Sequence, residues 1–171
     1  MRIRLAIATA SMMVPTAAFA HPGHPSGLGF ADGILHPLTG ADHLVAALLV
    51  GALAALSRST RSALGAFLAA LAAGLLSGDA FPQVAAAAEL GILLGFAALA
   101  AAFLLRESRA GFMPAGAAVT GFTHGLAHGS EGEAAVFAAG VLAATAALAG
   151  AGYLVARLSS GSRRTGASAL R

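Results

Sequence analysis

The chain has 171 residues, of which 58% are hydrophobic and only 10% are charged, and its formal net charge is +3. Soluble domains carry about 25% charged residues, so this composition excludes an ordinary soluble domain and predicts one all-α membrane domain, a bundle of about five transmembrane helices. The absence of cysteine excludes disulfides and thiolate metal sites, and arginines that fall singly or in pairs between apolar segments argue against a nucleic-acid partner.

Residues 1–20 have the three parts of a secretory signal peptide. Two arginines supply the positive start, a short apolar run follows, and the residues before His21 read Ala-Phe-Ala, a typical cleavage sequence. We expect cleavage there, which leaves residues 21–26 as a short extracytoplasmic tail. Its histidines, His21 and His24, could collect metal weakly or simply belong to a polar linker.

An expected five-span transmembrane domain occupies residues 27–158, and a polar cytoplasmic tail follows over residues 159–171. The first apolar segment is longer than one straight span needs, and Pro37 and Gly40 interrupt it, which predicts a kinked or broken helix. Gly and Ala residues throughout the segments allow close helix packing. The five segments are 27–56, 63–77, 84–105, 111–128 and 134–156.

The arginines and acidic residues of the loops predict the topology. If the mature N-terminus lies outside and the chain crosses five times, every mature arginine falls on the cytoplasmic side, while Asp79, Glu131 and Glu133 fall outside. This pattern obeys the positive-inside rule. It predicts a multi-pass protein with a periplasmic mature N-terminus and a cytoplasmic C-terminus.

In this topology, the polar side chains of the apolar segments lie in the outer half of the helix bundle. A charge near the bilayer centre costs about 2.5–3.5 kcal/mol, so such residues need a partner, and a divalent metal suits imidazole and carboxylate ligands. His124 and His128 share one helix face at i and i+4, and His36 and His43, seven residues apart, lie nearly on one face. The candidate metal residues are His36, Asp42, His43, Glu89, His124, His128 and Glu131.

Each of these residues also has a simpler structural explanation. A single membrane histidine can bond a neighbouring helix, Glu89 could be a protonated carboxyl, and Glu131 and Glu133 could form a solvated turn. Two histidine clusters on the same side nevertheless favour a metal or proton function. No phosphate-binding loop, Gly-x-Ser-x-Gly or His-Glu-x-x-His motif occurs, so we expect no enzyme activity.

At these residues the chain resembles the HupE/UreJ family of nickel and cobalt permeases. The family motif His-Pro-x-x-Gly-x-Asp-His-x-x-x-Met-x-x-x-Gly matches residues 36–51, with Ala47 in the methionine position. The later motif Phe-His-Gly-x-Ala-His-Gly-x-Glu matches residues 123–131, with Thr123 in place of the aromatic residue. Glu89 resembles the membrane glutamate of the third span. Family members commonly carry a further apolar span where this chain has its polar tail.

The resemblance implies a bacterial inner-membrane permease that takes up Ni²⁺ or Co²⁺ from the periplasm for metalloenzymes such as hydrogenase or urease. The ion would be the transported substrate, with no tightly bound cofactor, and the seven candidate residues would bind it. The expected partners are the divalent metal ion and the lipid bilayer, and assembly into a homo-oligomer stays open. Two alternatives also stay open: a non-transporting metal-binding sensor or delivery protein, and a proton-linked transporter of another solute.

Overall fold

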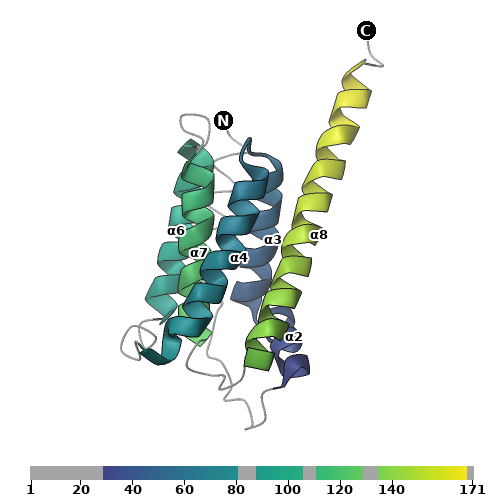
Figure 1. The fold of residues 1–171 in the computed structure, drawn as a ribbon. Coiled ribbons are helices and arrows are strands. Elements are labelled where there is room, and N and C mark those ends of the chain that lie inside the picture. Colours follow the sequence, from purple (N-terminus) through teal and green to yellow (C-terminus); the bar gives the residue numbers. More distant parts are fainter. Residues whose placement is uncertain (1–28, 81–87, 106–110, 129–134, 169–171) are drawn as a thin grey trace.

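The computed structural model describes residues 29–80, 88–105, 111–128 and 135–168, and almost all of them are helical (Figure 1). Within these ranges the chain has six α-helices, one short 3-10 helix and no strand, which confirms the predicted all-α fold. The expected signal peptide, residues 21–26 and Glu131 lie outside the described residues. The elements are α2 (Phe30–Thr39), α3 (Ala41–Ala55), α4 (Thr60–Ser77), η2 (Gly78–Ala80), α6 (Ala88–Leu105), α7 (Phe112–His128) and α8 (Ala135–Ser168).

The helices pack as two groups. In one, α7 lies against both α4 and α6, and in the other, α8 lies against both α2 and α3. Contacts between the α4–α6–α7 group and the α2–α3–α8 group are much sparser. From α3 to α8, successive helices run alternately up and down the bundle, so α3 and α8 rise in the same direction (Figure 1).

The predicted break in the first segment is confirmed. The axes of α2 and α3 are bent by 80° at Gly40, whose backbone is extended (φ −77°, ψ 111°). Pro37 lies inside α2 and has no N–H to donate to the preceding turn. The Gly40 N–H still makes a regular helical bond to the His36 carbonyl at 2.9 Å, and the extended backbone of Gly40 then ends α2. One apolar segment therefore becomes two helices with an elbow between them.

The other boundaries follow the expected segments closely, with one large difference. We expected the fifth segment to end at residue 156 and a polar tail to follow, but α8 continues to Ser168. No proline removes an N–H in this stretch, and the Ser159 and Ser160 hydroxyls donate to carbonyls of the preceding turn. Polar side chains alone do not end a helix when they can face water.

By length and composition, α4 and α8 can each cross a membrane, and the bent pair α2 and α3 can provide a third span. The apolar part of α6, Leu90–Leu105, is shorter. These are the candidate spans among the residues that the structure describes, and the count of five spans stays a prediction. What the helices establish is a membrane protein.

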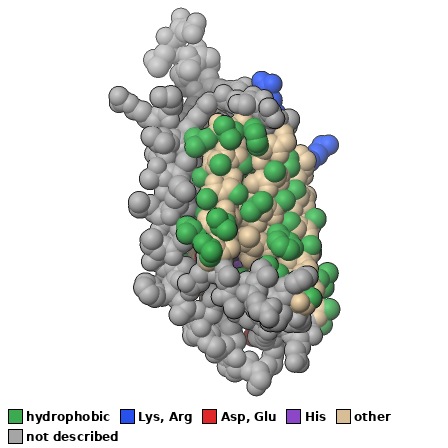
Figure 2. Space-filling view, turned by 90° about the vertical axis from the view of Figure 1, so that its left-hand side faces the viewer, with side chains coloured by type: hydrophobic (Ala, Val, Ile, Leu, Met, Phe, Trp, Pro, Cys, Tyr) green, Lys and Arg blue, Asp and Glu red, His purple; other side chains and the backbone are tan. Residues whose placement is uncertain are grey.

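The outer surface supports the same conclusion. On the described part of the face in Figure 2, apolar side chains are spread over the surface, and the basic side chains in view lie near its upper end. Soluble monomers rarely expose apolar surface continuously. The exposed large apolar residues include Leu35, Leu76, Leu90, Leu94, Val136, Leu154, Val155 and Leu158.

Glycines allow α3 and α8 to approach closely. A Cβ atom added at Gly152 would clash with the Leu48 carbonyl, and one added at Gly51 would clash with the Ala149 carbonyl. By contrast, a Cβ atom added at Gly150 would meet nothing within 4 Å. Close approach of small residues is the usual source of helix association in lipid, where no hydrophobic effect drives it.

Gly152→Ala and Gly150→Ala therefore form a matched pair on one helix. We expect Gly152→Ala to lower the melting temperature of the purified protein in detergent by about 5 °C, because overpacking costs about 1–3 kcal/mol. Gly150→Ala should keep or slightly raise it, since Ala favours helices over Gly by about 1 kcal/mol. Equal melting temperatures for the two variants would contradict the close contact between α3 and α8.

Candidate metal centre

Four histidines and one aspartate are buried together where the elbow meets the end of α7. His36 lies in the last turn of α2, Asp42 and His43 lie in the first turn of α3, and His124 and His128 lie in the last turns of α7. None of these side chains is more than 4% exposed. The α2–α3–α8 group thus supplies three of the five residues, and the α4–α6–α7 group supplies two.

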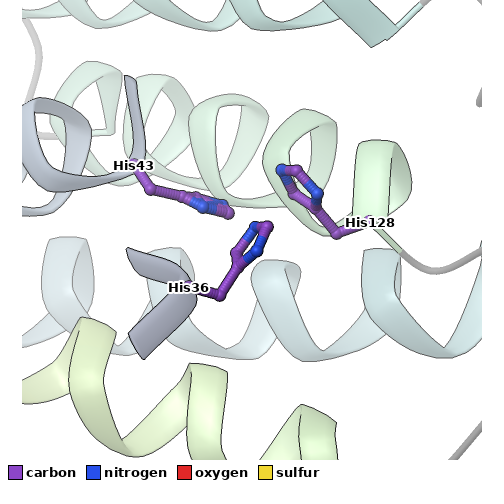
Figure 3. A group of neighbouring side chains, drawn as sticks. All are labelled: His36, His43 and His128. Carbon is purple, nitrogen blue, oxygen red and sulfur yellow. The ribbon is translucent and has the colours of Figure 1, made fainter. Parts of the chain in front are cut away.

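Three of the imidazoles converge on one point (Figure 3). His36, His43 and His128 each offer a ring nitrogen, and these nitrogens all lie within 4.8 Å of one another. Imidazole nitrogens bind divalent transition metals at about 2.0–2.1 Å, so two nitrogens on one ion lie at most about 4 Å apart. In a tetrahedral site three such nitrogens lie about 3.4 Å from one another, so the separations of up to 4.8 Å would need to shorten by at most about 1.5 Å for the rings to share an ion.

His43 is the central ring of the cluster. Its centroid lies 5.1 Å from that of His36, 4.5 Å from that of His128 and 5.0 Å from that of His124. His36 and His128 are closer still, with centroids 4.3 Å apart. His43 therefore links the three-histidine group to the fourth histidine.

One ring nitrogen of His124 makes a hydrogen bond, and the other has no hydrogen-bond partner. Its Nδ1 lies 2.8 Å from the Thr120 carbonyl, which can only accept, so Nδ1 carries the proton and donates. In the neutral ring this leaves a lone pair on Nε2, which is buried and has no hydrogen-bond partner. A metal-binding histidine typically donates its other N–H to a carbonyl in this way.

Asp42 is the carboxyl group of the cluster. Its Oδ2 atom is buried without a hydrogen-bond partner. The centre lies where α2 and α7 end and α3 begins. A carboxyl group beside the three imidazoles makes the ligand set suited to a divalent cation.

The structure places the sequence-predicted residues as follows. It brings His36, Asp42, His43, His124 and His128 together. Glu89 is the second residue of α6, but its side chain lies outside the described residues, as do Glu131, His21 and His24.

Three residues that the sequence did not single out contact the centre. The Phe137 ring of α8 lies 5.8 Å from His36, and the Phe96 ring of α6 lies 5.8 Å from His124. Thr120 orients His124 through its carbonyl, while its hydroxyl donates to the Gly95 and Gly116 carbonyls. Thr120 lies one helical turn before His124, so the sequence could have identified it as a hydrogen-bond partner. The contacts of Phe137 and Phe96 with the histidines depend on how the helices pack, which the sequence does not give.

Comparison with known proteins gives a family match. The family model described as HupE / UreJ protein matches residues 9–170, nearly the whole chain. No curated protein and no solved structure matches the chain.

Because His43 contacts the other three imidazoles of the centre, its loss should weaken metal binding most. We expect His43→Ala to weaken Ni²⁺ binding to the purified protein by about 100-fold or more, since loss of even an outer-shell partner costs 10–100-fold. Equilibrium dialysis with ⁶³Ni²⁺ measures this. Asp32→Asn is the control, because Asp32 is exposed at the start of α2 and should leave the affinity unchanged. Equal affinities for both variants would remove His43 from the centre.

Proposed function

The chain belongs to the HupE/UreJ family, and from this premise we propose that it is a permease that takes up Ni²⁺ or Co²⁺ across the bacterial inner membrane. The family is linked to nickel and cobalt transport rather than to enzyme activity. The supply of metalloenzymes such as hydrogenase or urease is part of the same proposal.

The observation that carries the proposal is the convergence of His36, His43 and His128 from three helices. Buried polar groups in a membrane protein are costly, and three neutral imidazoles with an adjacent carboxylate are a ligand set suited to divalent transition metals. Nickel and cobalt accept the same nitrogen and oxygen ligands, so both are expected substrates. His124, Asp42, Glu89 and Glu131 would complete the coordination, and His21 and His24 would help to capture the ion.

The division of the centre between two helix groups supports transport rather than permanent storage. His36, Asp42 and His43 belong to the α2–α3–α8 group, and His124 and His128 belong to the α4–α6–α7 group. The backbones of the two groups approach closely at fewer places than those within each group, and apolar side chains fill the space between them. Many transporters expose a site alternately to the two sides by moving one bundle against another. A small movement between these groups would separate the ligands and release the ion.

The arginines give the proposed direction of uptake. α3 carries the chain about 20 Å from Asp42 to Ala55, and Arg58 and Arg61 follow, so the centre and these arginines lie toward opposite ends of the bundle. The positive-inside rule then puts the centre toward the periplasm. A divalent cation moving inward gains about 4.6 kcal/mol per 100 mV of inside-negative potential, which can drive uptake without a nucleotide.

We expect wild-type protein in proteoliposomes to take up ⁶³Ni²⁺ saturably under an inside-negative potential, with competition by Co²⁺ but not Mg²⁺. His36→Ala and Asp42→Ala should each lower the initial rate by about 100-fold or more, because each removes a buried ligand. Asp32→Asn again serves as the control and should keep the wild-type rate.

Unchanged uptake by His36→Ala would contradict the assignment of the centre. Binding without uptake by the wild-type protein would place the chain among metal sensors or delivery proteins. Uptake of another solute that depends on pH but not on Ni²⁺ would support the proton-linked alternative.

A further inference from the structure

His124 is held like a metal ligand, yet it lies outside the three-histidine group whose nitrogens are within 4.8 Å of one another. Its Nδ1 atom donates to the Thr120 carbonyl, and the Thr120 hydroxyl in turn donates to the Gly95 and Gly116 carbonyls. The ring is therefore fixed in one tautomer, with the lone pair on a buried Nε2 atom that has no hydrogen-bond partner. A ligand prepared in this way, but apart from the group, needs an explanation.

The ring distances show with which histidine His124 can share an ion. Two imidazoles that bind one ion at about 2.0–2.1 Å, with nitrogens about 90–109° apart around it, have ring centroids about 4.5–5.1 Å apart. The centroids of His43 and His124 are 5.0 Å apart, and those of His43 and His128 are 4.5 Å apart. His43 therefore has a spacing that suits a shared ion with either of its neighbours on α7.

The orientation of the rings shows which of them would have to move. His43 and His124 are stacked with 28° between their planes, so one ring must turn before both can direct a nitrogen at the same ion. His124 is held by its bond to the Thr120 carbonyl. We therefore assign the turn to His43.

His124 also lies deeper in the bundle than His128. α7 starts at the end of the bundle toward which α3 carries the chain before Arg58 and Arg61, and it ends at His128 (Figure 1). Four residues of helix separate the two histidines by about 6 Å along the axis and keep them on one face. An ion held by His124 would therefore lie farther from the outer end than one held by the three-histidine group.

A carboxyl oxygen is available beside the ring of His43. Asp42 precedes it in the first turn of α3, and the Asp42 Oδ2 atom is buried without a hydrogen-bond partner. Two imidazoles and a carboxylate are a ligand set for a divalent transition metal. Within the described residues, the core farther along α3 is apolar and includes Val50 and Phe67, so an ion beyond His124 finds no further imidazole there.

We propose that the centre offers a divalent cation two successive positions that share His43: an outer position with His36 and His128, and an inner position with His124. This inference rests on the proposed function and divides its ligands between two steps. As the ion moves inward, His43 turns with it while His124 stays fixed on Thr120. The ion then remains partly coordinated throughout, and two positions in series allow it to leave a site that binds it well.

Metal binding tests the two positions without transport. His124→Asn places an amide N–H where Nδ1 donates to Thr120 and removes Nε2, so the buried hydrogen bond is kept. We expect His124→Asn to bind Ni²⁺ within about threefold of wild type, because the outer position is intact, whereas His128→Ala should weaken binding by about 30-fold. In the His128→Ala background the ion occupies the inner position, so adding His124→Asn should weaken binding by about tenfold more.

Uptake tests whether the inner position is a step of transport. In proteoliposomes, His124→Asn should take up ⁶³Ni²⁺ about tenfold or more slowly than wild type, because the ion would have to pass from the outer position directly into the apolar core. Val119→Ala, at an exposed position of α7, is the control and should keep the wild-type rate.

A loss of affinity for His124→Asn as large as that for His128→Ala would overturn the inference, because all four histidines would then hold the ion at one position. So would the absence of any further loss when His124→Asn is added to His128→Ala. Wild-type uptake by His124→Asn would overturn the inner position as a step of transport. Absence of uptake by the wild-type protein would overturn the proposed function, and the binding measurements would still decide whether the two positions exist.

Discussion

The elbow between α2 and α3 is the constraint on which the rest of the structure depends. In a continuous helix, His36 and His43 would be separated by about 10 Å along the axis. The 80° bend at Gly40 instead brings their ring centroids to 5.1 Å. The same bend ends α2 and starts α3 inside the bundle, so that helix ends and buried side chains meet at one place.

Close backbone contacts hold the elbow in this shape. α8 packs against α2 where Gly33 and Gly140 meet. It packs against α3 where Gly51 meets Ala149 and Gly152 meets Leu48, and at each of these glycines an added Cβ atom would clash with the opposing backbone. The single helix α8 therefore packs against both arms of the bend, α2 and α3. On the other side of the centre, Gly125 of α7 meets the Leu71 carbonyl of α4 with similar closeness. Each group is tightly packed within itself, and the polar centre lies where the two groups meet.

The cost of burying polar groups in a membrane explains where the polar side chains of the core lie. Among the described residues, imidazoles and the one buried carboxylate are confined to one end, while the core toward the arginines is built from Ala, Val, Leu and Phe. A transporter needs a site that binds strongly enough to select an ion and a route that does not trap it. For the proposed permease, the clustered imidazoles can meet the first requirement, and the core beyond them contains no buried carboxylate among the described residues.

The sequence by itself determined the all-α membrane class, the break near Pro37 and Gly40, the family and the four histidines and one aspartate of the centre. These follow from local rules: hydropathy over a window, the missing proline N–H, and the i to i+4 spacing of His124 and His128. Only the tertiary structure decided that His36, His43 and His128 form the close group while His124 stands beside it, and that Phe137 contacts His36. The reason is physical: those distances depend on the angle of the bend and on the packing of α8 and α7 against their neighbours, and spacing along one chain segment contains neither.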